Sequence, residues 1–193
     1  MVAAVVLAAG LAQRMGRSKV LLPWRGRPLV AHVVAAAWRG GADPVVVVVS
    51  PEVAAWGALA PAVPYEVWVN PEPGAGMAAS LVVGVRAVAG RAHAALVCLG
   101  DQPTLRPEAV AALVARADLG VPVVPAYRGV RGHPVLFPAS LFPELLRLAG
   151  DRGAREVLER HPPAVVPLDL LAPPDVDTPA DYEALCAATD GAP

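Results

Sequence analysis

Residues 7–19 read LAAGLAQRMGRSK, and they follow the five apolar residues VAAVV at positions 2–6. Five small or β-branched apolar residues in a row are typical of a buried strand, which the glycines and polar residues after them cannot continue. A loop that contains Gly10 and Gly16 and ends on Lys19 is typical of a phosphate-binding turn, because glycines let backbone N–H groups approach an anion. The spacing fits neither the dinucleotide fingerprint G-x-G-x-x-G nor the P-loop. An ordinary strand–loop–helix connection explains the same spacing, so both interpretations stay open on the loop alone.

Lys19 is the only lysine of the sequence, beside fifteen arginines. A lysine ammonium is a compact point charge, whereas an arginine presents a wide planar fork, so the two are not interchangeable in a tight loop. All the remaining Lys or Arg positions are arginine, and the one lysine lies in a glycine-bounded loop. This usage favours a functional role for the ammonium of Lys19.

The totals limit the class of protein. A length of 193 residues suits one α/β domain that buries roughly 70% of its unfolded surface. Hydrophobic residues make up 55% of the chain, yet the valine run 45–49 is far shorter than the ~20 residues of a membrane span. The net charge of −1 is not that of a general nucleic-acid binder, and no basic segment precedes the first strand. Cys98 and Cys186 match no metal-ligand spacing, which favours buried free thiols in a reducing cytosol. We therefore expect a cytoplasmic protein without signal peptide, membrane segment or nucleic-acid partner.

Strands and helices are expected to alternate along most of the chain. Pro28 opens an apolar segment that stops at Gly40, which is the usual arrangement of proline and glycine at the two ends of a helix. The valines at 45–49 are apolar on both faces, as a central parallel strand must be. The β-α-β-α-β order predicts a doubly wound sheet with its ligand at the carboxyl ends of the strands. The expected strands are 2–6, 45–49, 65–69, 94–99, 121–125 and 164–168, and the expected helices are 28–38, 53–59, 80–88 and 107–117.

Two loops after expected strands carry chemical signals. The segment 70–81, NPEPGAGMAASL, contains the only asparagine of the chain, Asn70, and two glycines that permit close backbone approach; a flexible turn before a helix is the alternative. The segment 100–103 reads GDQP and places Asp101 directly after a hydrophobic strand. A role of Asp101 as N-cap is a poor explanation, because the next helix is expected only from Pro107. Mg²⁺ prefers one or two carboxylates together with phosphate oxygens, so Asp101 is a candidate metal ligand.

The last informative segment, 174–182, reads PDVDTPADY. Thr178 is a plausible N-cap with proline at the first helical position, and Asp181 reaches back as a variant of the capping box. This capping explains Thr178 and Asp181 but leaves Asp175 and Asp177 without a structural reason.

The loop quoted first, extended to LAAGLAQRMGRSKVLLPWRGRPLV, resembles the signature L-A-A-G-x-S/G-x-R-M-G-x-x-K-x-L-L-P-x-x-G-x-P-L of the MobA-like nucleotidyltransferases. More narrowly it resembles the molybdenum cofactor cytidylyltransferases of the MocA type. Ala12 departs from the pattern, where the family has Ser or Gly. Four later segments resemble family motifs in the same order: N-x(5)-G-M-x-x-S-L-x-x-G from Asn70 to Gly84, GDQP at 100–103, GHPVLF at 132–137 with GDRGAR at 150–155, and DVDTPADY at 175–182.

The resemblance implies a fold and a set of site residues. The fold is a three-layer α/β/α sandwich of the nucleotide-diphospho-sugar transferase type, mostly parallel with one antiparallel strand near Val135. It forms a single domain over 1–189, followed by a disordered tail at 190–193. By resemblance, the implied catalytic residues are Arg14, Lys19 and Asp101; the nucleotide-binding residues are Leu7, Ala8, Ala9, Gly10, Asn70 and Ser80; the acceptor-binding residues are Gly132, His133 and Arg155; and the ligands of Mg²⁺, or of Mn²⁺, are Asp101 and Asp177.

The activity implied by the resemblance is transfer of CMP from CTP to the phosphate of molybdopterin or the molybdenum cofactor, with transient contact to a molybdoenzyme or its chaperone. Two alternatives stay open. A nucleotidyltransferase of the same fold can act on a sugar phosphate or another phosphorylated alcohol with UTP, GTP or CTP. A non-catalytic molybdenum cofactor-binding chaperone binds without releasing pyrophosphate. For the basic turn 128–137 and for Arg155, a solvated surface is the alternative interpretation.

Overall fold

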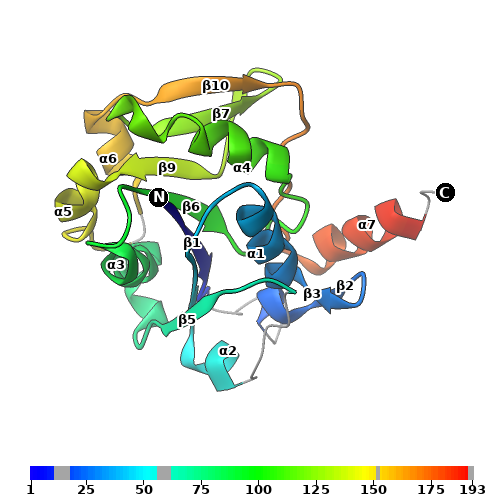
Figure 1. The fold of residues 1–193 in the computed structure, drawn as a ribbon. Helices are drawn as coiled ribbons and strands as arrows, with labels where there is room; N and C mark the ends of the chain where they lie inside the picture. Colours follow the sequence, from blue (N-terminus) through cyan, green and yellow to red (C-terminus); the bar gives the residue numbers. More distant parts are fainter. Residues whose placement is uncertain (11–17, 56–61, 151–152, 191–193) are drawn as a thin grey trace.

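The computed structural model describes residues 1–10, 18–55, 62–150 and 153–190, and the statements below concern these residues. Its centre is strand β1 (Val2–Ala8), which pairs in parallel with β4 (Val45–Val49) on one side and with β6 (Ala94–Leu99) on the other (Figure 1). The sheet order is β10-β7-β9-β6-β1-β4-β5. The remaining strands are β5 (Glu66–Val69), β7 (Val123–Tyr127), β8 (Val130–Arg131), β9 (Val135–Pro138) and β10 (Ala164–Leu168), and β2 (Pro23–Trp24) with β3 (Arg27–Pro28) forms a separate hairpin.

The sheet is covered on both faces, because successive side chains of a strand point to opposite sides. In β1, Val2, Ala4 and Val6 belong to a buried cluster with α1 (Leu29–Arg39) and α4 (Pro107–Val114). The alternate residues pack on the other face against α3 (Met77–Val88), beside α5 (Phe142–Leu145) and α6 (Arg155–Arg160). Both layers are visible in Figure 1. The predicted three-layer α/β/α architecture is confirmed.

The predicted antiparallel strand near Val135 is also confirmed. β9 pairs antiparallel with β6 and with β7, whereas β7 and β10 are parallel to each other. The described part holds a further short antiparallel strand that the sequence did not suggest, because β8 folds back on β7 through Arg128 and Gly129, both with positive φ.

Several element ends differ from the prediction for local reasons. Pro28 is not the first residue of α1 but its N-cap, since it also ends the hairpin strand β3. Helix α3 begins at Met77 instead of residue 80, directly after Gly76, whose φ of 97° turns the chain. Helix α2 (Pro51–Ala55) starts before the expected 53, and the rest of that expected helix lies outside the described residues.

Two further ends are shifted. Helix α4 stops at Val114 and a 3₁₀ turn follows, so it is shorter than the expected 107–117. Strand β7 spans Val123–Tyr127 instead of 121–125, because its pairing with β10 begins at Val123, opposite Ala164, and continues to Tyr127, opposite Leu168.

The C-terminal helix α7 (Pro179–Asp190) projects away from the sheet (Figure 1). The helix reaches Asp190, the first residue of the expected tail, and residues 191–193 lie outside the described part. Cys98 is a buried free thiol as predicted, but Cys186 on α7 is only half-buried, since one side of this helix faces solvent. No helix in the described ranges has both the length and the apolar composition of a membrane span.

The order of the strands places a ligand crevice. From β1 the chain continues to β4 and β5 on one side of the sheet, and it returns to β6 on the other. The strand order therefore reverses between β1 and β6, where Leu7 lies opposite Leu99. In open α/β sheets, ligands bind at such a reversal, outside the carboxyl ends of the strands. The loops that begin at Ala9 and Gly100 flank this crevice.

We predict that Gly84→Ala destabilises the fold. Gly84 lies in α3 where the helix meets the sheet; a Cβ there overlaps Cγ1 of Val5 and lies 3.1 Å from Cγ2 of Val48. Overpacking of a core costs about 1–3 kcal/mol, more than the ~1 kcal/mol that alanine gains over glycine in a helix. Urea unfolding measures the change. Gly74→Ala is the matched control, because its Cβ meets no atom within 4 Å. Equal stability of Gly84→Ala and wild type contradicts this packing.

Candidate functional site

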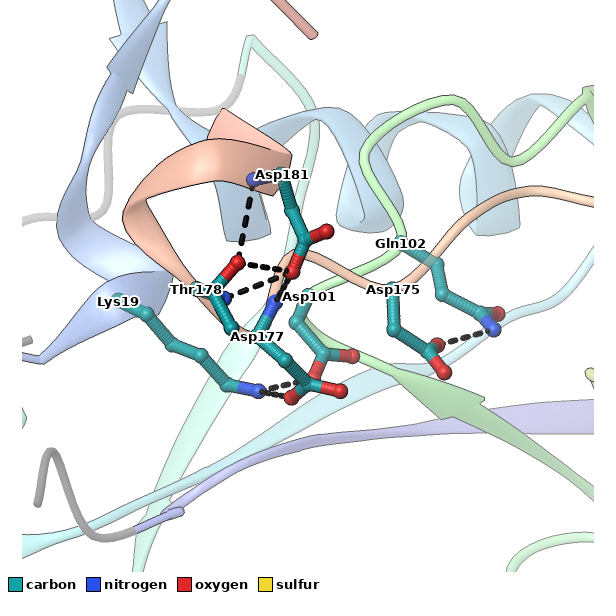
Figure 2. A network of polar contacts seen from close by, with 7 residues as sticks. All are labelled: Lys19, Asp101, Gln102, Asp175, Asp177, Thr178 and Asp181. Atoms are coloured by element: carbon teal, nitrogen blue, oxygen red, sulfur yellow. Dashed lines mark hydrogen bonds and ion pairs between the residues drawn. The ribbon is translucent and has the colours of Figure 1, made fainter. Parts of the chain in front are cut away.

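The crevice brings one cation and two carboxylates together. The ammonium Nζ of Lys19, in the 3₁₀ turn Lys19–Leu21, donates to Oδ2 of Asp101 and to Oδ1 of Asp177, both at 2.6 Å (Figure 2). Asp101 follows β6 and lies 82 residues from Lys19 in the chain. Asp177 precedes α7 and lies 158 residues from Lys19. We call these three side chains the Lys19 triad.

Hydrogen bonds hold the C-terminal segment against the loop after β6. The N–H of Val176 donates to the carbonyl of Asp101 at 3.0 Å, and Nε2 of Gln102 donates to Oδ1 of Asp175 at 2.8 Å. Gln102 is buried whereas Asp175 is exposed, so this contact ties the exposed C-terminal segment to a buried side chain. These two bonds fix the backbone from which Asp177 points toward Lys19, as Figure 2 shows.

The start of α7 is capped as the sequence predicted. Oδ2 of Asp181 accepts hydrogen bonds from the N–H groups of Thr178 at 2.8 Å and Asp177 at 3.1 Å. Oγ1 of Thr178 accepts the N–H of Asp181 at 3.2 Å. Asp181 and Thr178 therefore cap the helix without the carboxylate of Asp177. That carboxylate accepts a hydrogen bond from Lys19, while the carboxylate of Asp175 accepts one from Gln102.

Burial and charge act in opposite directions within the Lys19 triad. Burial lowers the pKa of Lys19, but hydrogen bonds and attraction from Asp101 and Asp177 outweigh it, so that the pKa lies above its usual 10.5. Burial raises the pKa of Asp101, the bond to Lys19 lowers it in part, and the nearby charge of Asp175 raises it further. The side chain of Asp101 is 17% exposed and that of Asp177 is 55% exposed. The site thus joins an inner and an outer carboxylate.

The donor set fits a divalent cation that also takes ligands from a substrate. No group of three or more His, Cys, Asp or Glu side chains in the described ranges is arranged to hold a metal ion. Asp101 and Asp177 nevertheless reach a single nitrogen at 2.6 Å each, so both can reach one ion. Mg²⁺ commonly uses one or two carboxylates, waters and phosphate oxygens instead of an all-protein cage.

A hollow of about 600 Å³ opens beside the Lys19 triad. Its size is that of sites for drug-sized ligands. Five residues predicted at the nucleotide or metal site line it beside the triad's Lys19 and Asp101: Leu7, Ala9, Gly10, Ser80 and Asp177. The other lining residues are Val20, Pro73, Gly74, Gly76, Met77, Leu99 and Asp175. We call it the donor hollow.

Two predicted nucleotide-binding residues lie outside the donor hollow, and one predicted catalytic residue lies outside the described part of the chain. Ala8 is buried in the core on the side of α1, because its strand neighbours Leu7 and Ala9 point the other way. Asn70 is buried and donates from Nδ2 to Oγ of Ser80 at 3.0 Å, while its Oδ1 accepts the N–H of Glu72 at 3.0 Å. Asn70 therefore supports the loop and Ser80 instead of lining the site. Arg14 lies outside the described residues.

A second hollow, of about 810 Å³, adjoins the first. We call it the acceptor hollow; it shares Leu7, Met77 and Leu99 with the donor hollow. All three predicted acceptor residues line it, and so does Arg131, which the sequence analysis did not assign. The apolar lining residues include Leu81, Val97, Val124, Val135, Phe137 and Leu158. The only signal for Arg131 was its place in the basic turn, which is equally typical of solvated surface.

His133 is the buried polar group of the acceptor hollow. Its carbonyl accepts a hydrogen bond from the hydroxyl of Tyr127 at 2.7 Å, whereas its ring Nδ1 is buried and has no hydrogen-bond partner in the described part. Burial lowers the pKa of His133, and the charges of Asp175 and Asp101 offset this only in part. Arg155, by contrast, is exposed and lies 3.5 Å from Glu159.

Comparisons with known proteins agree with this arrangement. Residues 4–165 match the family described as MobA-like NTP transferase domain. Nicotine blue oxidoreductase of Paenarthrobacter nicotinovorans is 36% identical over 191 residues, which cover 94% of this chain and 92% of that protein. A molybdenum cofactor guanylyltransferase of Xanthomonas euvesicatoria is 54% identical over 43 residues, or 22% of this chain and 23% of that protein. The structure of Rv0371c from Mycobacterium tuberculosis in complex with manganese is 30% identical, with a TM-score of 0.83 over 97% of this chain and 98% of that chain. The resemblance seen in the motifs is confirmed.

We predict that His133 makes the fold sensitive to acid. Since burial lowers its folded-state pKa below the usual 6.5, the folded state disfavours the protonated ring. Its contribution to stability is present above 6.5 and is lost as the pH falls below that value. Between about pH 7 and about pH 5, wild type should lose more unfolding free energy than His133→Gln, measured by urea titration. Parallel pH profiles of the two proteins would refute this.

Proposed function

The chain belongs to the MobA-like NTP transferase domain family and is a nucleotidyltransferase of that family, and on this premise we propose that it transfers CMP from CTP to the phosphate of molybdopterin or the molybdenum cofactor. The observation that carries the proposal is the Lys19 triad at the junction of two hollows. A group-transfer enzyme must hold a donor and an acceptor on either side of the reacting atom, and the two hollows meet at Leu7, Met77 and Leu99 beside the triad.

The donor hollow suits a nucleoside triphosphate. Gly10, Gly74 and Gly76 let backbone approach the phosphates, and the ammonium of Lys19 supplies the positive charge. A divalent cation held by Asp101 and Asp177, Mg²⁺ or Mn²⁺, supplies neutralisation of the charge that develops on the phosphates. The structure of the mycobacterial relative in complex with manganese supports the use of a divalent ion.

The reaction needs no covalent enzyme intermediate. A phosphate oxygen of the acceptor attacks the α-phosphorus of CTP in line, a new P–O bond forms, and the bond between the α- and β-phosphates breaks with release of pyrophosphate. Lys19 donates hydrogen bonds to the phosphate oxygens and stabilises their charge, while the walls of the two hollows hold the reactants in line. Catalysis therefore rests on positioning and charge stabilisation, as is usual for phosphoryl-type transfer.

The acceptor hollow suits a ring system with an anionic group. Its walls are mostly apolar, and Arg131 and Arg155 lie on its lining. A guanidinium binds a phosphate with two parallel hydrogen bonds, and the orphan Nδ1 of His133 gives a buried polar contact for a heteroatom of the ring. The local identity to a molybdenum cofactor guanylyltransferase supports molybdopterin as this acceptor. A cytoplasmic location, with a molybdoenzyme or its chaperone as recipient, completes the proposal.

The decisive assay measures pyrophosphate release with each of the four NTPs, with and without molybdopterin. Release that needs both CTP and molybdopterin supports the proposal. Release with a sugar phosphate instead gives the alternative acceptor, and binding of molybdopterin without release gives a chaperone. The name of the Paenarthrobacter relative adds an oxidoreductase to the alternatives, so a redox reaction of the added substrate without release of pyrophosphate also overturns the proposal.

We predict that Lys19→Ala lowers the rate by about 10²–10³, the usual loss when one preorganised donor to a developing charge is removed. Lys19→Arg should recover little of this, because the planar fork cannot place a point charge 2.6 Å from both Asp101 and Asp177. Pyrophosphate release at saturating CTP measures both variants. Near-normal turnover of Lys19→Arg would show that a point charge is not required.

We predict that Ala9 contributes to the choice of base. The guanylyltransferase branch of the family has a similar signature but reads L-A-G-G, with glycine where this chain has Ala9, which is buried and lines the donor hollow. One methyl group narrows the hollow for a purine and is worth only ~1–3 kcal/mol of discrimination. Wild type should prefer CTP, and Ala9→Gly should raise the relative use of GTP without reversing the preference. Competition with equal CTP and GTP measures this; a wild type that prefers GTP overturns the cytidylyl assignment.

A further inference from the structure

A third hollow, of about 410 Å³, shares no lining residue with the donor or the acceptor hollow. It lies between the β2–β3 hairpin, helix α1, the segment before α4 and helix α7. Each of the first three elements contributes arginine: Arg25 and Arg27 from the hairpin, Arg39 from the last turn of α1, and Arg106 from the residue before α4. No aspartate or glutamate lines it within the described residues. We call it the arginine hollow.

The charge of the arginine hollow is largely uncompensated. Arg106 lies 3.4 Å from Glu108, but Arg25, Arg27 and Arg39 form no ion pair with a carboxylate in the part of the chain that the structure describes. Several like charges around one concavity repel one another and concentrate the field there, which favours an anionic ligand. The net charge of the chain is only −1, so this positive concentration is local.

Three further groups shape the hollow for a ligand. The guanidinium of Arg25 lies 4.7 Å from the ring centroid of Trp24, which fixes it in place. His32 lines the hollow, and its pKa is lowered, first by burial and then by the charges of Arg27 and Arg25. Oγ1 of Thr104 is buried and has no hydrogen-bond partner among the described residues. A buried hydroxyl without a partner costs free energy, and a ligand oxygen would satisfy it.

We propose that the arginine hollow binds a small molecule that bears two or more linked phosphate groups. Phosphate suits the site because guanidinium groups bind it with paired hydrogen bonds. A compact ligand suits it because the arginines come from separate segments around one concavity of ligand size, instead of forming a stripe along one element. The arginine hollow is distinct from the proposed donor site, because Lys19 lines the donor hollow and not the arginine hollow.

Calorimetric titration with inorganic tripolyphosphate, without divalent metal, tests the proposal on the full chain. Arg27→Gln/Arg39→Gln should bind at least about tenfold more weakly than wild type, since two charge-assisted contacts are lost. Arg86→Gln is the matched control: it removes an exposed arginine on α3 and should bind like wild type. Because tripolyphosphate also fits the proposed donor site, the arginine variants are compared on a Lys19→Ala background, in which one binding event must remain. Absence of binding to wild type, equal loss in the control, or loss of all binding in Lys19→Ala overturns the site.

Thr104→Val provides a second test that does not depend on charge. If the Thr104 hydroxyl binds a ligand oxygen, the isosteric valine should weaken tripolyphosphate binding several-fold. Thermal stability without ligand should stay the same or rise, because the substitution removes an unsatisfied polar atom. Unchanged affinity, or lower stability in the absence of ligand, contradicts the role given to Thr104. Thermal melting of each variant without ligand shows that the fold is retained.

Discussion

The contact on which the site depends is the ammonium of Lys19 held between Asp101 and Asp177 at 2.6 Å each. Three segments that are far apart in the chain must be in place for this contact to form. The loop after β1 brings the cation, the loop after β6 brings the inner carboxylate, and the segment before α7 brings the outer one. Because two negative charges face one positive charge, the group retains affinity for a further cation, which is the electrostatic basis of a metal-dependent transfer site.

The sheet makes this convergence possible. β1 and β6 are parallel neighbours, so their carboxyl ends, where Leu7 lies opposite Leu99, are at the same edge of the sheet. The strand order reverses at this point, which is where open α/β sheets bind ligands. Gly84 lets α3 lie close to β1 and β4, and the same helix begins at Met77, which lines both hollows. Core packing and site geometry are therefore two consequences of the same arrangement.

Much of the fold could be predicted from the sequence because the central strands are apolar on both faces. The central strands 45–49 and 94–99 were predicted with the bounds that the structure gives, and so was the edge strand 164–168. Element ends that depend on a single turn were not, as at Gly76, where a positive φ moves the start of α3. Helical periodicity carries no information about such a turn.

Site residues could be predicted from the sequence where a single loop carries the signal. Contacts between segments that are far apart in the chain could not. Asp101, directly after a strand, gave a local signal. The site role of Asp177 rested on family resemblance alone, and its contact with Lys19, 158 residues away, was not predicted. Local sequence also could not separate Asp175 from Asp177; the bond of Gln102 to Asp175 does so in the folded chain. Arg131 and the arginine hollow were missed for the same reason, because their neighbours come from other parts of the chain.

The most direct test of the central claim is the binding of Mn²⁺ in the presence of CTP, followed by electron paramagnetic resonance. Asp177→Asn should weaken Mn²⁺ binding by about tenfold or more, because it removes one of two protein ligands. Asp175→Asn is the matched control, since it changes the same functional group two residues away on a side chain that contacts Gln102 and not Lys19. It should bind Mn²⁺ like wild type. If Asp175→Asn weakens Mn²⁺ binding and Asp177→Asn does not, the assignment of the two carboxylates is wrong.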